Sequence, residues 1–122
     1  MPVRSYQDLI AWQKSMDLAY EVFILTKQFP KEELYGLTSQ LRRAGVSVPS
    51  NIAEGQGRRN DREFAHFLDI AHGSICELET QVMLAQRFEY IGAEHATPVL
   101  AVAAEVGRLV SGLVAKLRTD LS

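Results

Sequence analysis

This chain of 122 residues has one cysteine and three histidines, so it contains few of the residues that usually mark disulfides and metal sites. Its single cysteine, Cys76, excludes an intrachain disulfide and indicates a reducing compartment. No apolar run reaches the about 20 residues that a membrane-spanning helix requires. The first residues also lack the apolar centre of a secretory signal. We therefore expect a cytoplasmic protein that does not enter a membrane.

Net charge is also low, at −2 with a pI near 5.9, so the chain as a whole is not expected to attract nucleic acid strongly. The positive charges are unevenly distributed, however. Between residues 42 and 62 five arginines face only two acidic residues, Glu54 and Asp61. The five arginines are Arg42, Arg43, Arg58, Arg59 and Arg62. They form either a candidate polyanion-binding surface or a solvated helix face.

Turn and capping residues divide the chain into four predicted helices. Apolar residues recur every three or four positions, which is the period of an amphipathic helix. The predicted helices begin near Ser5, near Glu32, after Asn60 and at Pro98, and they end near residues 30, 57, 91 and 118. Long helices with short connections pack as antiparallel neighbours. We therefore predict an all-α, antiparallel up-and-down four-helix bundle, with residues 1–122 as a single domain.

The second predicted helix contains a proline within its apolar stripe. Pro49 lacks a backbone N–H and clashes with the preceding turn, which costs about 3 kcal/mol in a helix interior. Gly45, four residues earlier, leaves room for the ring. We therefore expect a helix that is kinked at Pro49 and ends at Gly55-Gln-Gly57. In the first helix we expect one core stripe, formed by Leu9, Trp12, Met16, Ala19, Phe23 and Thr26.

The fourth predicted helix has a face of small residues opposite its core stripe, and the second helix has a comparable polar face. A helix with little polarity on either side is usually buried on both sides. We interpret these faces as the subunit interface of a homo-oligomer. The alternative is that the alanines are only exposed surface residues, because alanine has a high helix propensity. The predicted interface residues are Arg43, Ser47, Ser50, Glu54, Ala101, Ala104, Arg108, Gly112 and Ala115.

The histidines do not predict a metal site. Di-iron bundles place Glu-x-x-His motifs on two different helices. Here Glu63-x-x-His66 and the weaker Asp69-x-x-His72 lie on the same predicted helix, and their side chains spread around it. We therefore expect no metal.

Nucleotide and thiol chemistry are not indicated either. The segment Gly55-Gln-Gly57 follows a predicted helix, whereas a phosphate-binding loop follows a strand. Cys76 has no histidine at a spacing that predicts pairing, so we expect it to be a buried or partly buried structural thiol. We predict a protein that is not an enzyme, with no catalytic residues and no cofactor.

The most specific motif runs from Gln40 to Gly55 and reads Gln-Leu-Arg-Arg-Ala-Gly-Val-Ser-Val-Pro-Ser-Asn-Ile-Ala-Glu-Gly. Arg58, Glu63-Phe64, Phe67-Leu68 and the stretch from Ala71 to Glu79 follow it, and Leu9-x-x-Trp12, Phe29-Pro30 and residues 35–40 precede it. Over roughly residues 6–91 this pattern resembles the rRNA intervening-sequence protein family. These small four-helix-bundle proteins are named for reading frames inside insertions in bacterial 23S rRNA genes.

The resemblance implies a ring-like homo-oligomer, with five subunits as the implied number. A more distant resemblance is to the accessory variability protein of diversity-generating retroelements. That pentameric bundle binds nucleic acid and a reverse transcriptase through a basic surface. The pI near 5.9 of the present chain departs from that basic character.

Two functional hypotheses follow. In the first, an oligomer associates with RNA or DNA because the five arginines contact phosphates; no aromatic residue lies among them, so no base readout is predicted. In the second, the oligomer is a protein–protein interaction scaffold that binds no nucleic acid. Its arginines would then pair with Glu54, Glu77 and Glu79, within the bundle or between subunits.

Overall fold

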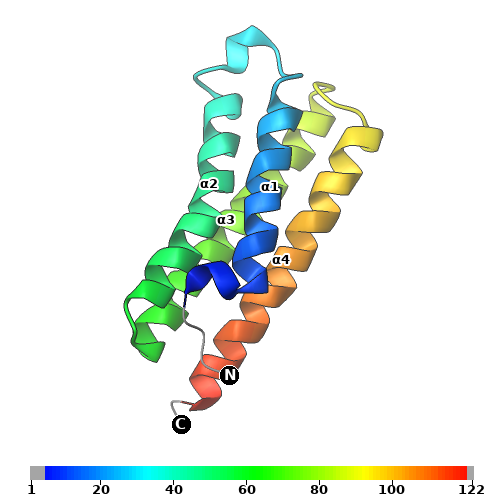
Figure 1. The fold of residues 1–122 in the computed structure, drawn as a ribbon. Coiled ribbons are helices and arrows are strands. Elements are labelled where there is room, and N and C mark those ends of the chain that lie inside the picture. The colour runs from blue at the N-terminus through cyan, green and yellow to red at the C-terminus, as the bar shows by residue number, and fades with distance from the viewer. Residues whose placement is uncertain (1–4, 121–122) are drawn as a thin grey trace.

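A computed structural model describes residues 5–120, and in this range it contains four long helices and no strand. The long helices are α1 (Ile10–Thr26), α2 (Leu37–Gly57), α3 (Asp61–Arg87) and α4 (Ala93–Asp120), and two short 3-10 helices are η1 (Tyr6–Asp8) and η2 (Lys31–Glu33). Successive long helices run in opposite directions (Figure 1). The predicted up-and-down four-helix bundle is therefore confirmed.

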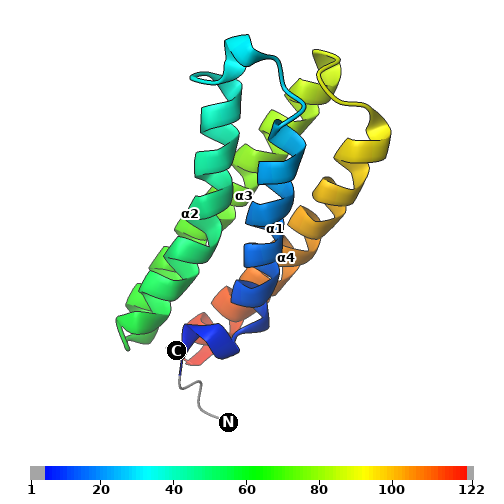
Figure 2. The ribbon, with the colours of Figure 1, turned by 45° about the horizontal axis from the view of Figure 1, so that its top comes forward.

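Each long helix packs against two others. α1 contacts α2 and α4, and α3 contacts the same two helices, whereas the described helices show no α1–α3 or α2–α4 packing. The α1–α2 and α3–α4 connections lie at one end of the bundle, and the α2–α3 turn lies at the other (Figures 1 and 2). The α1–α2 seam is therefore on the opposite side of the bundle from the α3–α4 seam.

One hydrophobic core fills the space between the helices. Burying a leucine or isoleucine side chain contributes about 1.5–3 kcal/mol, so these residues decide which face of each helix turns inward. The largest fully buried side chains are Leu18, Leu41, Ile52, Leu68, Ile75 and Leu78.

The inward face of α1 differs from the predicted stripe. Leu18 and Val22 are fully buried, whereas Met16 and Phe23 are 46% and 43% exposed. Both faces of α1 are apolar, and the inner one includes Ser15, whose hydroxyl donates to a backbone carbonyl and so is tolerated in the core. The prediction that Met16 and Phe23 are core residues is wrong.

The connection before α2 is fixed by Glu33. Its Oε1 accepts a hydrogen bond from the Leu37 backbone N–H (3.0 Å), and its Oε2 accepts one from the Tyr90 hydroxyl (2.7 Å). The hydrogen bond from the Leu37 backbone lowers the pKa of Glu33 most, and the bond from the Tyr90 hydroxyl lowers it further. The bond to Glu33 raises the pKa of Tyr90. α2 consequently begins at Leu37 and not, as predicted, at Glu32.

α4 also begins elsewhere than predicted. It starts at Ala93, and Pro98 lies inside the helix rather than at its first position. The Gly92 carbonyl accepts a hydrogen bond from the Ala96 N–H (3.0 Å), so the first turn forms before the proline is reached.

Within α2, Pro49 is buried and the helix continues past it to Gly57; a kink at Pro49 stays a prediction. The helix ends at the predicted segment Gly55-Gln-Gly57, and Gly55 is buried in its last turn. A Cβ on Gly55 would lie 2.7 Å from the Phe67 Cβ and 3.1 Å from the Phe64 Cδ1. The missing side chain therefore lets α3 approach α2 closely.

By length and composition alone, α4 is apolar enough to cross a membrane, a test that core helices of bundles also pass. Only 22% of its most apolar 18-residue stretch is buried in the bundle. Val99, Val106 and Val110 enter the core. The other large apolar residues of α4 are partly buried against this core, so its outward face carries mainly small and polar residues; they are Leu100, Val102, Leu109, Leu113 and Leu117.

Candidate functional site

The five predicted nucleic-acid-binding arginines do not form one patch. Arg42 and Arg43 lie in the first turns of α2, whereas Arg58 follows its last turn. Arg58 lies sixteen positions after Arg42, which corresponds to about 24 Å of helix. The fold therefore brings Arg58, Arg59 and Arg62 together at the α2–α3 turn and leaves Arg42 and Arg43 toward the opposite end.

Arg42 is engaged within the chain. Its Nε donates to the Thr26 Oγ1 (2.7 Å), and its guanidinium lies 4.5 Å from the centroid of the Phe23 ring. This half-buried side chain ties α2 to α1. Arg43 is exposed and makes no ion pair with the rest of the described chain.

The α2–α3 turn is built from three residues. Arg58 closes α2, and its Nη2 lies 2.9 Å from the Glu54 Oε2. Arg59 has a φ of 58°, in the left-handed region, which reverses the chain. Asn60 then caps α3, because its Oδ1 accepts a hydrogen bond from the Glu63 N–H (3.0 Å). This cap matches the sequence prediction.

Arg59 and Arg62 provide the free positive charge at this turn. Both are exposed, and neither forms an ion pair within residues 5–120. Asp61 and Glu63 occupy the first turn of α3, where a negative charge suits the positive end of the helix dipole. The turn therefore projects two guanidinium groups, with the paired Arg58 beside them.

Of the three glutamates proposed as partners for the arginines, only Glu54 forms an ion pair with one of them in the described chain. Glu54 pairs with Arg58, as above. Glu77 and Glu79 form no ion pair with the described residues. Glu77 lines a polar groove in the α2–α3 seam, together with Gln40, Arg43, Ser47 and Ser74.

The predicted interface residues of α2 occupy two different seams. The Ser47 hydroxyl lies 2.8 Å from the Ser74 hydroxyl, and the Asn51 Nδ2 donates to the Ser47 carbonyl (2.8 Å). Ser47 therefore joins α2 to α3 in the same chain. Ser50 is exposed and lies on the other side, along the α1–α2 seam.

On α4 the predicted interface residues lie on the face away from the core. Ala104 is half-buried, whereas Ala101, Arg108, Gly112 and Ala115 are exposed. Beside this face, an ion pair between Arg118 and Asp69 joins α4 to α3.

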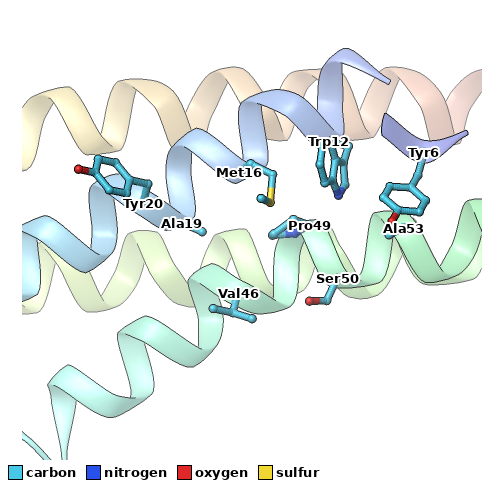
Figure 3. A pocket seen from close by; sticks show the side chains of 9 residues that line it. All are labelled: Tyr6, Trp12, Met16, Ala19, Tyr20, Val46, Pro49, Ser50 and Ala53. Atoms are coloured by element: carbon cyan, nitrogen blue, oxygen red, sulfur yellow. The ribbon is translucent and has the colours of Figure 1, made fainter. Parts of the chain in front are cut away.

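An apolar groove of about 530 Å³ along the α1–α2 seam was not predicted. Figure 3 shows its walls, with Trp12 and Met16 from α1 on one side and Val46 from α2 on the other. Tyr20 and Val46 are 66% and 59% exposed. The signal was present in the sequence, because Met16, Tyr20 and Phe23 are spaced by four and three residues and form a second apolar stripe.

Cys76 is exposed, so the expectation of a buried or partly buried thiol is wrong. Its neighbours Ile75 and Leu78 take the inward positions of α3. The Cys76 Sγ lies 3.8 Å from the His72 Nδ1, one turn earlier, a pairing that the sequence analysis missed. Within residues 5–120, no three His, Cys, Asp or Glu side chains are grouped so that they could hold a metal ion.

Comparison with known proteins identifies the family. The chain matches the family model described as 23S rRNA-intervening sequence protein over residues 7–112. A crystal structure of a protein of unknown function from the S23 ribosomal protein family of Bacteroides thetaiotaomicron has the same fold, with a TM-score of 0.80 and 25% identity over 87% of this chain and 96% of that one. No curated protein matches. The chain therefore belongs to the 23S rRNA-intervening sequence protein family.

Proposed function

We propose that this chain is a non-catalytic, cytoplasmic protein that assembles into a homo-oligomer and binds RNA or DNA through the α2–α3 turn. The observation that supports this most is the pair of exposed guanidinium groups on Arg59 and Arg62, which have no acidic partner in the described chain. The planar fork of a guanidinium matches phosphate oxygens. Arg58 adds a third positive group that binding could release from Glu54.

The expected mode of binding is contact with the phosphate backbone. Phe64 and Phe67 are the aromatic residues next to the turn, and both are half-buried against Gly55. The Arg58 guanidinium already lies over the Phe67 ring, 5.2 Å from its centroid, and Phe64 packs against Gly55, so base stacking and sequence readout are not expected. The proposed target is consequently an RNA or DNA that is recognised through its phosphate backbone.

Self-association makes such a small site effective. Two free arginines on one chain of net charge −2 provide little attraction on their own. Several turns on one rigid assembly bind a long polyanion much more tightly than one turn does, because later contacts form at high effective concentration.

The proposal is tested by replacing arginines at the two ends of α2. Arg59→Glu/Arg62→Glu should weaken binding to a labelled RNA duplex on the order of tenfold or more at low salt, because phosphate contacts are lost. Arg43→Glu is the matched control, since Arg43 is also exposed and unpaired but lies at the other end of α2. Fluorescence anisotropy measures both. Equal losses in the two variants would contradict a site at the turn.

A protein–protein interaction scaffold is the second candidate. The apolar groove between α1 and α2 favours it, because large exposed apolar surfaces mark sites of protein contact. Wild-type protein that binds no nucleic acid at low salt would support this alternative.

A further inference from the structure

The polar groove in the α2–α3 seam has a volume of about 330 Å³ and lies along the first half of α2. Two side-chain pairs lie at its ends. The Ser47 and Ser74 hydroxyls are 2.8 Å apart, and the Gln81 Nε2 donates to the Gln40 Oε1 at 3.5 Å. The pairs are separated by seven residues on each helix, which corresponds to about 10 Å. Between them the inner wall includes Ala44, whose small buried side chain leaves room for a ligand.

The two walls of the groove carry opposite charges. Arg43 on α2 and Glu77 on α3 both line the groove, and both are exposed. No ion pair joins them to each other or to another described residue. The groove therefore offers a guanidinium on one wall and a carboxylate on the other. A polyanion does not suit it, because the Glu77 carboxylate would repel phosphates.

Gln81 provides an independent observation at one end of the groove. Its side chain is only 6% exposed, and its Oε1 has no hydrogen-bond partner in the described chain. Buried amide oxygens nearly always accept a hydrogen bond, because an unsatisfied one has lost its contact with water. Gln81 lies one turn after Glu77, so the two acceptors are neighbours on one face of α3.

Gln40 separates this orphaned oxygen from the open groove. The Gln40 side chain is exposed, and in the described chain its one hydrogen bond is the 3.5 Å contact with Gln81. That distance is long for a hydrogen bond, so Gln40 is held weakly. A donor that enters beside Glu77 displaces Gln40 at little cost and reaches the Gln81 Oε1.

We propose that the polar groove binds a free amino acid as its zwitterion. The ligand carboxylate accepts hydrogen bonds from the Arg43 guanidinium, whose planar fork matches a carboxylate. The ligand ammonium has three N–H donors, and it donates to the Glu77 carboxylate and to the Gln81 Oε1. Both charged groups of an amino acid are attached to one carbon, so one small molecule serves both walls. This site is separate from the α2–α3 turn and does not depend on the proposed nucleic-acid binding.

The experiment is an NMR chemical-shift titration of the wild-type protein with three probes. L-glutamine carries both charges, N-acetyl-L-glutamine carries only the carboxylate, and L-glutaminamide carries only the ammonium. We expect L-glutamine to shift the backbone amides of Ala44 and Glu77. Each single-charge probe should bind on the order of tenfold more weakly or worse, because one charge-assisted hydrogen bond is lost.

Variants assign the roles of the two walls. Arg43→Gln and Glu77→Gln should each weaken L-glutamine binding on the order of tenfold, for the same reason. Gln81→Leu should weaken binding without making the protein easier to unfold in urea, because leucine leaves no buried oxygen unsatisfied. Arg59→Gln is the matched control, since it removes an exposed, unpaired arginine outside the groove, and it should leave the affinity unchanged.

Three results would overturn the assignment. The site is wrong if L-glutamine, L-serine and glycine all leave the amides of the groove unshifted. Equal affinities for L-glutamine and N-acetyl-L-glutamine would show that Arg43 binds a simple anion and that no zwitterion is recognised. An equal loss of affinity in Arg43→Gln and Arg59→Gln would show a general charge effect in place of a defined groove.

Discussion

At the residue scale, two glycines lie in opposite environments. Gly55 is buried where the phenylalanines of α3 approach α2, so a side chain there has no room. Gly73 is exposed in the middle of α3 with no atom near the position of its missing Cβ. The sequence indicates Gly55 only as part of the Gly55-Gln-Gly57 helix end, since crowding depends on the neighbouring helix.

Gly55→Ala should destabilise the bundle by about 1–3 kcal/mol, because the new Cβ overlaps the Phe67 Cβ. Gly73→Ala should stabilise it by about 0.5–1 kcal/mol, because alanine favours the helix and meets no obstacle. Urea denaturation at low protein concentration measures both. The packing explanation fails if the two variants shift stability in the same direction.

Glu33 makes stability dependent on pH. Its pKa is lowered in the folded state, so the stability it contributes is present above its ordinary pKa and is lost as the pH falls through the folded value. The gap in stability between wild type and Glu33→Gln should therefore be largest near neutral pH and shrink below about pH 4. The neighbouring Glu32→Gln makes a suitable control. A stability difference that stays constant from neutral pH to about pH 3 in acid titrations would contradict the role assigned to the Glu33–Leu37 and Glu33–Tyr90 hydrogen bonds.

At high pH the relevant group is Tyr90, the hydrogen-bond partner of Glu33. The pKa of Tyr90 is raised, so its contribution is present below the ordinary tyrosine value of about 10 and is lost as the pH rises through the folded value. The Glu33–Tyr90 bond joins the two connections at this end of the bundle, and it should open under both extremes.

At the scale of helices, the sequence predicts which helices exist and in what order better than it predicts where each helix begins and which face it buries. Asn60 and the breaks around it predict the start of α3 correctly, because a cap is a local interaction. The start of α4 is missed because its first turn closes on the Gly92 carbonyl, before Pro98 is reached, so the proline does not mark the start. The face of α1 is missed because Leu18 and Met16 belong to two equally apolar stripes, and only packing against the other helices decides which stripe is buried.

Pro49 is the element-scale feature with a testable role. Pro49→Ala restores a backbone donor in α2 and removes a ring from the wall of the α1–α2 groove. We expect circular dichroism to show a fully helical protein whose assembled mass is changed. An unchanged mass would count against a role of Pro49 in assembly, and a structure of the variant would test the predicted kink.

At the scale of the whole molecule, the candidate nucleic-acid site is predicted in part. Counting charges along the sequence groups five arginines, but the rise of α2 separates Arg42 and Arg43 from the turn. Arg42 is further withdrawn by its hydrogen bond to Thr26, a partner sixteen residues away that no local pattern predicts. Arg59 and Arg62 remain, and the proposed binding depends on repeating them in an assembly.

The most direct test is an anisotropy titration of the wild-type protein against a structured rRNA fragment and a random RNA duplex, at low and moderate salt. The account predicts similar affinities for the two RNAs and a steep loss of both with salt, because counterions are released from contacted phosphates. Absence of binding at low salt, or affinity that does not change with salt, would contradict it.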